Sequence, residues 1–429
     1  MDFAEALRAL DDRIPTRMAP DLDRMRALSE LLDHPERTYP SIHITGTNGK
    51  TTTAFVATAL LRAAGLTVGT YTSPHLHSVR ERIAYDGASI GENDFAEALT
   101  YLEPFLSQVD TLGTRVTYFE TLTMLAEVWF AERAVDAAVV EVGMGGTWDA
   151  TNLVDGRVAV ITEVTIDHPE LGSTAVQIAG EKSGIIKAGA ICVTGEHDTE
   201  VLAVIEGRCR EGGAELRVGG NGFALEAREL AVGGQALDLR VGDRVYEQVF
   251  VPLHGERMAS DVLLALASVT AFLGDRPLED DLVRQALATL RSPGRMEVLR
   301  RRPLLVADGA HNPDAARSLA ETMASAFIWD RLIVVLGMLG DKDVAGVVDQ
   351  IVPLADELIV TAPRSQRAAP AERLAKEALR LVGAEARIAA TVEGAVAQAI
   401  ELAGETDAIL VTGSFTTVAE ARAVVLGLG

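Results

Sequence analysis

The sequence predicts an α/β protein in which a domain with a mostly parallel sheet is followed by a second, smaller α/β domain. In Ser41 to Gly65, a short alternating strand, a glycine-bearing turn and a helix with apolar periodicity follow one another. Further apolar strands alternate with helical runs along the chain, which is typical of a parallel sheet. The turn-forming run Ser292-Pro293-Gly294-Arg295 is a candidate hinge, after which the alternation restarts. We therefore expect two domains, residues 1–294 and residues 295–429.

The other expected elements follow in order along the chain. Residues 1–40 are expected to form one or two short helices, and residues 92–133 are mostly helical in pattern. Period-two alternation with glycine turns over residues 219–252 predicts an antiparallel patch, and a helix follows at residues 259–273. The remaining predicted strands are residues 67–72, 135–142, 158–164, 304–307, 332–336, 357–361 and 408–412.

Composition restricts the classes of function. The chain has 48% hydrophobic and 24% charged residues, as globular proteins in water do, and its net charge of -23 opposes nonspecific attraction to nucleic acid or an anionic membrane. We expect neither kind of partner. The N-terminus lacks the features of a signal peptide, so we expect a cytoplasmic protein, with a monomer as the default. Cys192 and Cys209 lack metal-ligand spacing and are expected to be packing residues.

The turn GTNGKT at residues 46–51 has the composition of an ATP phosphate-binding loop between a strand and a helix. Backbone N–H groups of such a turn face a polyphosphate, and the helix N-terminus adds partial positive charge. Lys50 would bridge the β- and γ-phosphates, and the Thr51 hydroxyl would reach a bound Mg²⁺. The full GxxxxGK[ST] pattern would need a glycine at Ile44, so the match is to a shorter variant. The alternative is a turn that merely connects strand and helix. The expected nucleotide contacts are Gly46, Thr47, Asn48, Gly49, Lys50 and Thr51.

Polar residues fall just beyond several predicted strands. Lys50, Ser73, Glu141 and His168 lie at such positions, and the carboxyl ends of parallel strands meet at one edge of a sheet. We therefore expect a single site. Phosphoryl transfer depends on positioning and charge neutralisation, and Glu141 could hold Mg²⁺ directly. His168 is a less usual ligand for so hard a cation, and chemistry alone favours a hydrogen-bonding role.

Two other segments could contribute to a site. Lys182 and Lys187 flank Ser183-Gly184. From composition alone, a functional role for the two lysines and a position on a solvated helix face are equally plausible. In the second domain, DGAHNP at residues 308–313 follows a strand end, where a ligand would again be expected.

A series of short motifs runs in a specific order along nearly the whole chain. They are GTNGKTT at 46–52, TSPHL at 72–76, RERI at 80–83, YFE at 118–120, EVGMGGTWDATN at 141–152, DH at 167–168, EKSGIIK at 181–187, PGR at 293–295, DGAHNP at 308–313, GDKD at 340–343 and TGS at 412–414. Together, though not singly, these motifs resemble those of the folylpolyglutamate synthase and dihydrofolate synthase family of the Mur ligase superfamily.

The resemblance implies an ATP-dependent carbon–nitrogen ligase that adds L-glutamate to dihydropteroate, to reduced folates or to both through an acyl phosphate, and we expect the bifunctional enzyme. It implies an N-terminal Mur-ligase-type ATP-binding and catalytic domain, with a P-loop-type sheet, and a C-terminal Rossmann-like glutamate-ligase domain. Ser73, Glu141 and His168 match magnesium ligands, which overrules the hydrogen-bonding role for His168. Lys182 matches a lysine that CO₂ carbamylates, so that its new carboxylate can hold a second Mg²⁺.

The resemblance also assigns substrate and nucleotide contacts. Thr117, Phe119, Asp149 and Ala150 match positions near the pterin site of the family. Arg82 is also assigned to the substrate. The nucleotide contacts outside the phosphate loop match Asp261, Arg295 and Asp308, and the glutamate side matches His311 and Ser414. Of these, His311 joins Lys50 and Lys182 as an expected catalytic residue.

The chain departs from the family pattern near the expected nucleotide site. Arg257, Met258 and Asp261 stand where His, Gln and Asn are common, and Thr147 stands where Arg is usual. A carboxylate only accepts hydrogen bonds, whereas the amide of Asn both donates and accepts, so recognition of the base could change. The loop after His168 is also short.

Two alternatives to a folate ligase follow. In one, the same ligase machinery joins a different acid and amine. In the other, the departures from the pattern indicate a catalytically impaired ATP-binding regulator. The motifs YFE and DGAHNP favour folate, and the intact charged positions favour catalysis.

Overall fold

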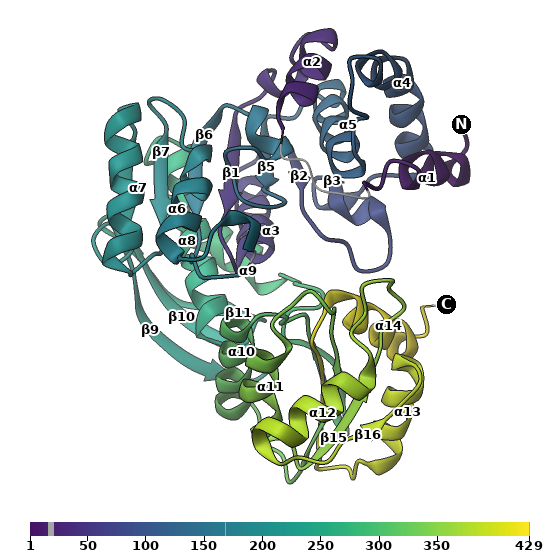
Figure 1. Cartoon of the computed structure of the whole chain (residues 1–429). Coiled ribbons are helices and arrows are strands. Elements are labelled where there is room, and N and C mark those ends of the chain that lie inside the picture. The colour runs from purple at the N-terminus through teal and green to yellow at the C-terminus, as the bar shows by residue number, and fades with distance from the viewer. Residues whose placement is uncertain (16–20, 168, 429) are drawn as a thin grey trace. The chain divides into compact units, whose positions relative to one another are not determined.

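The computed structural model describes residues 1–15, 21–167 and 169–428, which form two compact units (Figure 1). The first unit consists of Met1–Ala231, Ala236–Pro252 and Ala259–Leu290. The second takes in Val232–Gln235, Leu253–Met258 and the chain from Arg291 onward. The chain thus changes unit shortly before the Pro293-Gly294 turn, and no signal in the sequence marks the two short segments that join the second unit earlier.

An eight-stranded sheet organises the first unit, in the order β4-β3-β2-β5-β1-β6-β7-β8. In the part of the sheet that runs β2-β5-β1-β6-β7-β8, all neighbouring strands are parallel. Strand β3 pairs antiparallel with both β2 and β4. The loop after the central strand β1 therefore emerges beside the ends of β5 and β6. The strands are β1 Ser41–Thr45, β2 Val68–Tyr71, β3 Ile83–Tyr85, β4 Ala88–Ser89, β5 Ala137–Glu141, β6 Gly156–Ile161, β7 Ile191–Thr194 and β8 Glu215–Val218.

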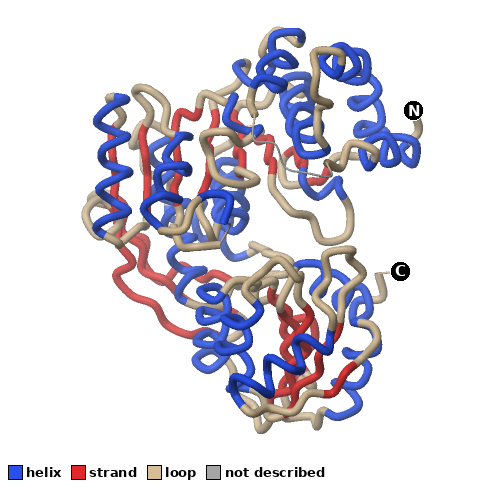
Figure 2. The backbone as a smooth tube through the Cα atoms, in the orientation of Figure 1, coloured by secondary structure: helices blue, strands red, loops and turns tan. Residues whose placement is uncertain are grey.

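Helices cover this sheet and bury its strands (Figure 2). Residues of α1, α2, α4 and α5 share a core with Tyr71 and Val140 from β2 and β5, and residues of α6 and α7 share another with Ile161 from β6. Every residue of β1 and β5 is buried, which explains their nearly continuous apolar character. The helices are α1 Phe3–Asp11, α2 Asp23–Leu31, α3 Lys50–Ala63, α4 Glu92–Asp110, α5 Tyr118–Glu132, α6 Ala175–Lys182, α7 Thr199–Gly212, α8 Glu256–Phe272 and α9 Asp280–Ala288.

A separate three-stranded sheet has the order β11-β10-β9. Its strands are β9 Phe223–Ala231, β10 Gly234–Val241 and β11 Arg244–Val251. Connections of two residues allow only antiparallel pairing, as the period-two pattern predicted.

The second unit has a six-stranded sheet in the order β12-β13-β17-β14-β15-β16, in which all pairs except β12 with β13 are parallel. Val306 and Val334 belong to the core that contains α10, α11 and α12, and Leu305 and Ile333 to the core that contains α13 and α14. Helices therefore cover both faces, as a parallel sheet requires. The elements are β12 Glu297–Arg301, β13 Leu304–Asp308, α10 Pro313–Ala326, β14 Leu332–Gly337, α11 Val344–Ile351, β15 Glu357–Thr361, α12 Ala371–Val382, β16 Arg387–Ile388, α13 Val392–Leu402, β17 Ala408–Thr412 and α14 Phe415–Leu426.

The predicted α/β class is confirmed, and the longer strands lie within a few residues of their predicted bounds. Strands β3, β4, β7, β8, β12 and β16 were not predicted, because each has two to five residues and pattern alone identifies such short runs poorly. Cys192 and Cys209 are buried packing residues of the first unit, as expected. Among the described residues, no helix is both long and apolar enough to cross a membrane.

Candidate active site

The loop predicted to bind phosphate connects β1 to the N-terminus of α3. Close contacts require glycine at two of its positions. Gly46 and Gly49 have φ angles of 147° and 87°, which side chains rarely adopt. A Cβ atom on Gly46 would lie 1.7 Å from Oγ1 of Thr162, and one on Gly49 would lie 2.2 Å from Oδ1 of Asp261. The loop backbone therefore packs directly against β6 and α8 of the first unit.

Two lysines converge on this loop. Nζ of Lys50 donates to the carbonyl oxygens of Gly46 and Thr47, at 2.9 and 3.1 Å, and Nζ of Lys182 donates to the same Gly46 oxygen at 2.6 Å. Burial, aided by the positive charge of Lys50, places the pKa of Lys182 well below its usual range. The interpretation of Lys182 as a lysine on a solvated helix face is wrong, because its residue surface is 4% exposed and α6 points it into the protein.

Glu141, the last residue of β5, links the start of α3 to the segment that follows β2. Its Oε1 accepts a hydrogen bond from Oγ1 of Thr51 at 3.0 Å, and its Oε2 accepts one from the backbone N–H of Ser73 at 3.1 Å. The carboxylate is 1% exposed, so it is held in one place beside the start of α3. The structure thus brings Lys50, Ser73 and Glu141 to one edge of the sheet.

The donor set at this edge suits a hard cation. The carboxylate of Glu141 and the hydroxyls of Thr51 and Ser73 supply oxygen, which Mg²⁺ prefers. His168, the remaining predicted ligand, lies outside the described residues. Within the described part of the chain, no group of three His, Cys, Asp or Glu side chains forms a metal-binding cluster.

The loop between β5 and the 3₁₀ turn η3 (Ala150–Leu153) is built around a buried carboxylate. Asp149 accepts hydrogen bonds from the backbone N–H groups of Met144 and Thr151, at 2.9 and 3.0 Å, and from the Thr151 hydroxyl at 2.6 Å. Burial raises the pKa of Asp149, and these hydrogen bonds oppose the rise. Asp149 therefore determines the shape of the loop, and Ala150 begins the buried η3 turn.

The predicted aromatic residue Phe119 lies against this loop. A Cβ atom on Gly143 would lie 2.4 Å from its ring, and the ring centroid is 6.0 Å from that of Tyr71. Thr117 caps α5, accepting from the N–H of Glu120, while the Glu120 carboxylate accepts from the N–H of Thr117 at 2.7 Å. The capping box places Phe119 on the first turn of α5.

Arg82 has partners that the sequence analysis did not single out. Its Nε donates to Nδ1 of His75 at 2.9 Å, and its guanidinium lies 5.6 Å from the ring centroid of Tyr118. Burial, with the charge of Arg82, lowers the pKa of His75 to about 4, so this imidazole is neutral near pH 7. The position of His75 two residues after Ser73, in the same TSPHL motif, was the signal that could have identified it.

Four more predicted residues lie in the second unit, just before β12 and at the ends of β13 and β17. Oδ2 of Asp308 accepts from the N–H of Met296 and Oδ1 from that of Ala310, each at 2.8 Å. Burial raises the pKa of Asp308, and the charge of Arg295 opposes this rise. The guanidinium of Arg295 lies 4.2 Å from the ring centroid of Phe415.

His311 and Ser414 occupy the turns next to these residues. Nδ1 of His311 is 2.8 Å from the carbonyl oxygen of Gly309, so this nitrogen carries the proton. Ser414 is buried and caps α14 by accepting from the N–H of Thr417. The structure thus groups Arg295, Asp308, His311 and Ser414 within one unit.

The positions that depart from the family pattern are well packed. Arg257 forms an ion pair with Asp314, with 2.7 Å between nitrogen and oxygen, and Met258 is buried. Thr147 donates from its hydroxyl to the carbonyl oxygen of Glu181 at 3.0 Å. Asp261 places a carboxylate against Gly49, where the phosphate-binding loop enters α3.

Comparison with known proteins defines the class as Mur ligases. The family model of the Mur ligase middle domain matches residues 44–269, and that of the Mur ligase glutamate ligase domain matches residues 294–415. A dihydrofolate synthase/folylpolyglutamate synthase of Mycobacterium tuberculosis is 40% identical over 96% of this chain and 92% of its own. The chain belongs to the dihydrofolate synthase/folylpolyglutamate synthase family.

Solved structures of family members have the same fold. The folylpolyglutamate synthase of Mycobacterium tuberculosis complexed with ADP has a TM-score of 0.94 at 40% identity, covering 99% of this chain and 98% of its own. The bifunctional folylpolyglutamate synthase/dihydrofolate synthase of Yersinia pestis, complexed with AMPPNP and a Mn ion, has a TM-score of 0.86 at 32% identity, with 99% and 98% coverage.

Proposed function

We propose that this protein is an ATP-dependent ligase that joins L-glutamate to dihydropteroate and to reduced folates through an acyl phosphate. The observation that carries the proposal is the convergence of Lys50 and Lys182 on the Gly46 carbonyl beside the Glu141 carboxylate. Such a set can neutralise transferred phosphate and hold a cation, which phosphoryl transfer requires. A relative named dihydrofolate synthase/folylpolyglutamate synthase matches this chain over nearly its whole length, which supports the choice of acid and amine.

The first unit would bind the triphosphate and the metal. We assign the nucleotide phosphates to Gly46, Thr47, Asn48, Gly49, Lys50 and Thr51, and Mg²⁺ to Ser73, Glu141 and His168. Bound Mg²⁺ would polarise the phosphoryl oxygens and neutralise their charge. Lys50 would orient the terminal phosphate, and Thr51 would position Glu141 through the hydrogen bond already present. The complex of the Yersinia pestis relative with AMPPNP and a Mn ion supports the use of a nucleotide and a divalent metal ion.

Lys182 is a proposed site of carbamylation. Carbamylation requires a neutral amine to attack CO₂, and the lowered pKa of Lys182 favours that form. The product is an anionic carboxylate on the lysine nitrogen, which would give a second Mg²⁺ an oxygen ligand where the unmodified side chain carries a cation. Its position against the phosphate-binding loop supports this role.

The pterin side of the acid substrate is assigned to the β5 loop and the start of α5. Phe119 offers an aromatic face to a flat heterocycle, and Asp149 fixes the loop on which Ala150 lies. Thr117 holds the first turn of α5, and Arg82 supplies a cation for a carboxylate of the substrate.

The second unit would contribute the remaining contacts. We assign Arg295, Asp308 and, from the first unit, Asp261 to the nucleotide, and His311 and Ser414 to glutamate. His311 is held in the turn after β13 by the hydrogen bond from its Nδ1 to the carbonyl oxygen of Gly309. Domain closure would exclude water from the acyl phosphate. The proposal includes a monomer that works in the cytoplasm.

One observation favours a second candidate, an ATP-binding regulator with impaired catalysis. The carboxylate of Asp261 lies against Gly49, where its negative charge would oppose a bound polyphosphate. This candidate predicts nucleotide binding without glutamate-dependent release of ADP.

The deciding experiment measures ADP release with Mg²⁺, ATP and L-glutamate, with dihydropteroate, tetrahydrofolate or no acceptor, and identifies products by mass spectrometry. Products with both acceptors would establish the two activities, and product with one acceptor would assign that activity alone. ATP binding without product from either acceptor would overturn the proposal in favour of the regulator or of a ligase with another acid.

A further inference from the structure

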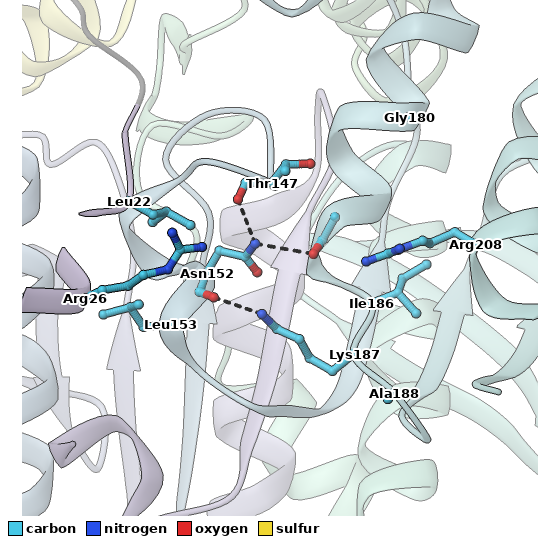
Figure 3. Close-up of a pocket in the computed structure, with 11 residues that line it drawn as sticks. Leu22, Arg26, Thr147, Asn152, Leu153, Gly180, Ile186, Lys187, Ala188 and Arg208 are labelled. Atoms are coloured by element: carbon cyan, nitrogen blue, oxygen red, sulfur yellow. Dashed lines mark hydrogen bonds between the residues drawn. The ribbon is translucent and has the colours of Figure 1, made fainter. Parts of the chain in front are cut away.

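A basic pocket lies in the first unit, beside the loop that follows β5 (Figure 3). It has a volume of about 500 Å³, and three cationic side chains from separate segments line it. Arg26 comes from α2, Lys187 follows the turn after α6, and Arg208 comes from α7. None of the described lining residues is acidic, although the chain has 62 acidic and 39 basic residues. The pocket is therefore a local concentration of positive charge.

Both arginines lie close enough to Lys187 to repel its positive charge. Nζ of Lys187 donates to the backbone carbonyl oxygen of Asn152 at 2.8 Å, which is a neutral acceptor. Burial lowers the pKa of Lys187, the negative charge of Asp155 opposes this change, and the positive charges of Arg208 and Arg26 add smaller lowering contributions. A bound anion would relieve this repulsion.

The two arginines can exchange their present partners for a ligand. Arg26 pairs with Asp23 at 2.9 Å, and both side chains are mostly exposed. Arg208 pairs with Glu211 at 3.8 Å, also at the surface. Exposed pairs of this kind contribute little, so a ligand with several negative groups would compete for both guanidinium groups.

We propose that this pocket binds a small polycarboxylate, namely the oligo-γ-glutamyl chain of a folate. Planar guanidinium groups match carboxylates, and a γ-linked chain keeps one free α-carboxylate for every glutamate. This choice of ligand rests on the proposed function, because the proposed ligase makes such chains. The existence of the basic pocket does not depend on that function. Lys50 and Glu141 do not line the pocket, so it is separate from the phosphate-binding loop.

The pocket is also connected to the reacting side of the protein. Gly180 and Gly184 line it and flank Lys182 in the chain, and the hydroxyl of the lining residue Thr147 donates to the carbonyl of Glu181. An occupant would therefore contact the segment that positions Lys182. We infer that the pocket retains the growing chain beside the segment that carries Lys182.

The test is the binding of tri-γ-glutamate, without pterin or nucleotide, measured by calorimetry at low salt. The double variant Arg26→Glu/Arg208→Glu should weaken binding by about tenfold or more, because two attractive charges become repulsive. Arg210→Glu is the matched control, since it reverses a charge on α7 at a residue that does not line the pocket and pairs with Glu206. Circular dichroism of all variants establishes that they are folded.

Equal binding by all three proteins would overturn the location, and no binding of tri-γ-glutamate by the wild type would overturn the ligand. Tripolyphosphate serves as a second probe. If it binds with the same dependence on Arg26 and Arg208 while tri-γ-glutamate does not, the pocket takes phosphate and the polycarboxylate assignment is wrong. Because no turnover is measured, these results are independent of whether the ligase reaction occurs.

Discussion

The loop after β1 and the turn after β13 occupy equivalent places, each between a parallel strand and a helix, yet opposite charges stabilise them. In the first, Lys50 and Lys182 donate to the loop carbonyl of Gly46. In the second, the Asp308 carboxylate accepts from two backbone N–H groups. The same topology thus supports a cationic site in one unit and an anionic one in the other. Loss of charge should therefore impair chemistry in the first and stability in the second.

The largest effect is expected from Lys50→Ala, which removes the cation nearest the expected phosphates. ADP formation should fall by about 100- to 1,000-fold, as for other losses of one charge-stabilising group, while the fold is retained. Steady-state kinetics and thermal unfolding would measure the two properties. The control is Arg62→Ala on the last turn of α3, which should leave both nearly unchanged. Near-normal turnover by Lys50→Ala would contradict the assignment of the phosphate-binding loop.

Lys182→Ala should also lose most of its activity, but added formate or acetate should restore part of it. The acid would replace the carbamate oxygens in the space that the lysine leaves. Activity is measured against acid concentration, with Lys50→Ala as the matched variant that acids should not rescue. If neither variant responds to acid, the role of Lys182 as a carbamate is unsupported.

In the second unit, Asp308→Ala should reduce the free energy of unfolding by about 1–3 kcal/mol, because two buried N–H groups lose their acceptor. Denaturant unfolding would measure the change. The control Asp341→Ala removes an exposed ion pair with Arg367 and should cost less than about 1 kcal/mol. Equal losses in the two variants would show that the Asp308 turn is not specially dependent on its carboxylate.

An effect that appears only as pH is changed should distinguish the bonded carboxylate of Asp308 from an unbonded one in the first unit. Glu127 on α5 is 2% exposed, and neither carboxylate oxygen has a hydrogen-bond partner among the described residues. Burial raises the pKa of Glu127 well above its usual range, with a further contribution from Glu36. The unfolded chain releases this proton at lower pH than the folded protein does, so stability falls as pH rises above the unfolded pKa.

Glu127→Gln should remove this dependence. The advantage of the variant over the wild type should grow by about 1.4 kcal/mol per pH unit between the unfolded and the folded pKa. Unfolding free energies measured from pH 4 to pH 8 would show this divergence, and the exposed Glu132→Gln on the same helix should run parallel to the wild type. Parallel curves for Glu127→Gln would mean that the buried carboxyl titrates normally.

The parts that could be predicted are those in which the signal is local. The phosphate-binding loop was identified because strand, glycines, lysine and helix lie within 25 neighbouring residues. The burial of Lys182 could not be predicted in this way. The residues around it also fit an exposed helix, and only the packing of α6 beside the loop of Gly46 decides between the two. Similarly, the bond from Arg82 to His75 depends on how the segment after β2 folds back.

The sequence by itself determined the α/β class, the longer strands and the family, because periodicity and the order of motifs are written along the chain. The expected meeting of Ser73 and Glu141 at one edge of the sheet also followed from the sequence, but tertiary structure alone decided which bonds form there, from the Thr51 hydroxyl and the Ser73 N–H to the Glu141 carboxylate. It also decided the charge properties of Lys182 and Glu127, because a pKa depends on burial and on neighbouring charges. Neither the burial of a side chain nor the charge of its neighbours is a property of a residue in isolation.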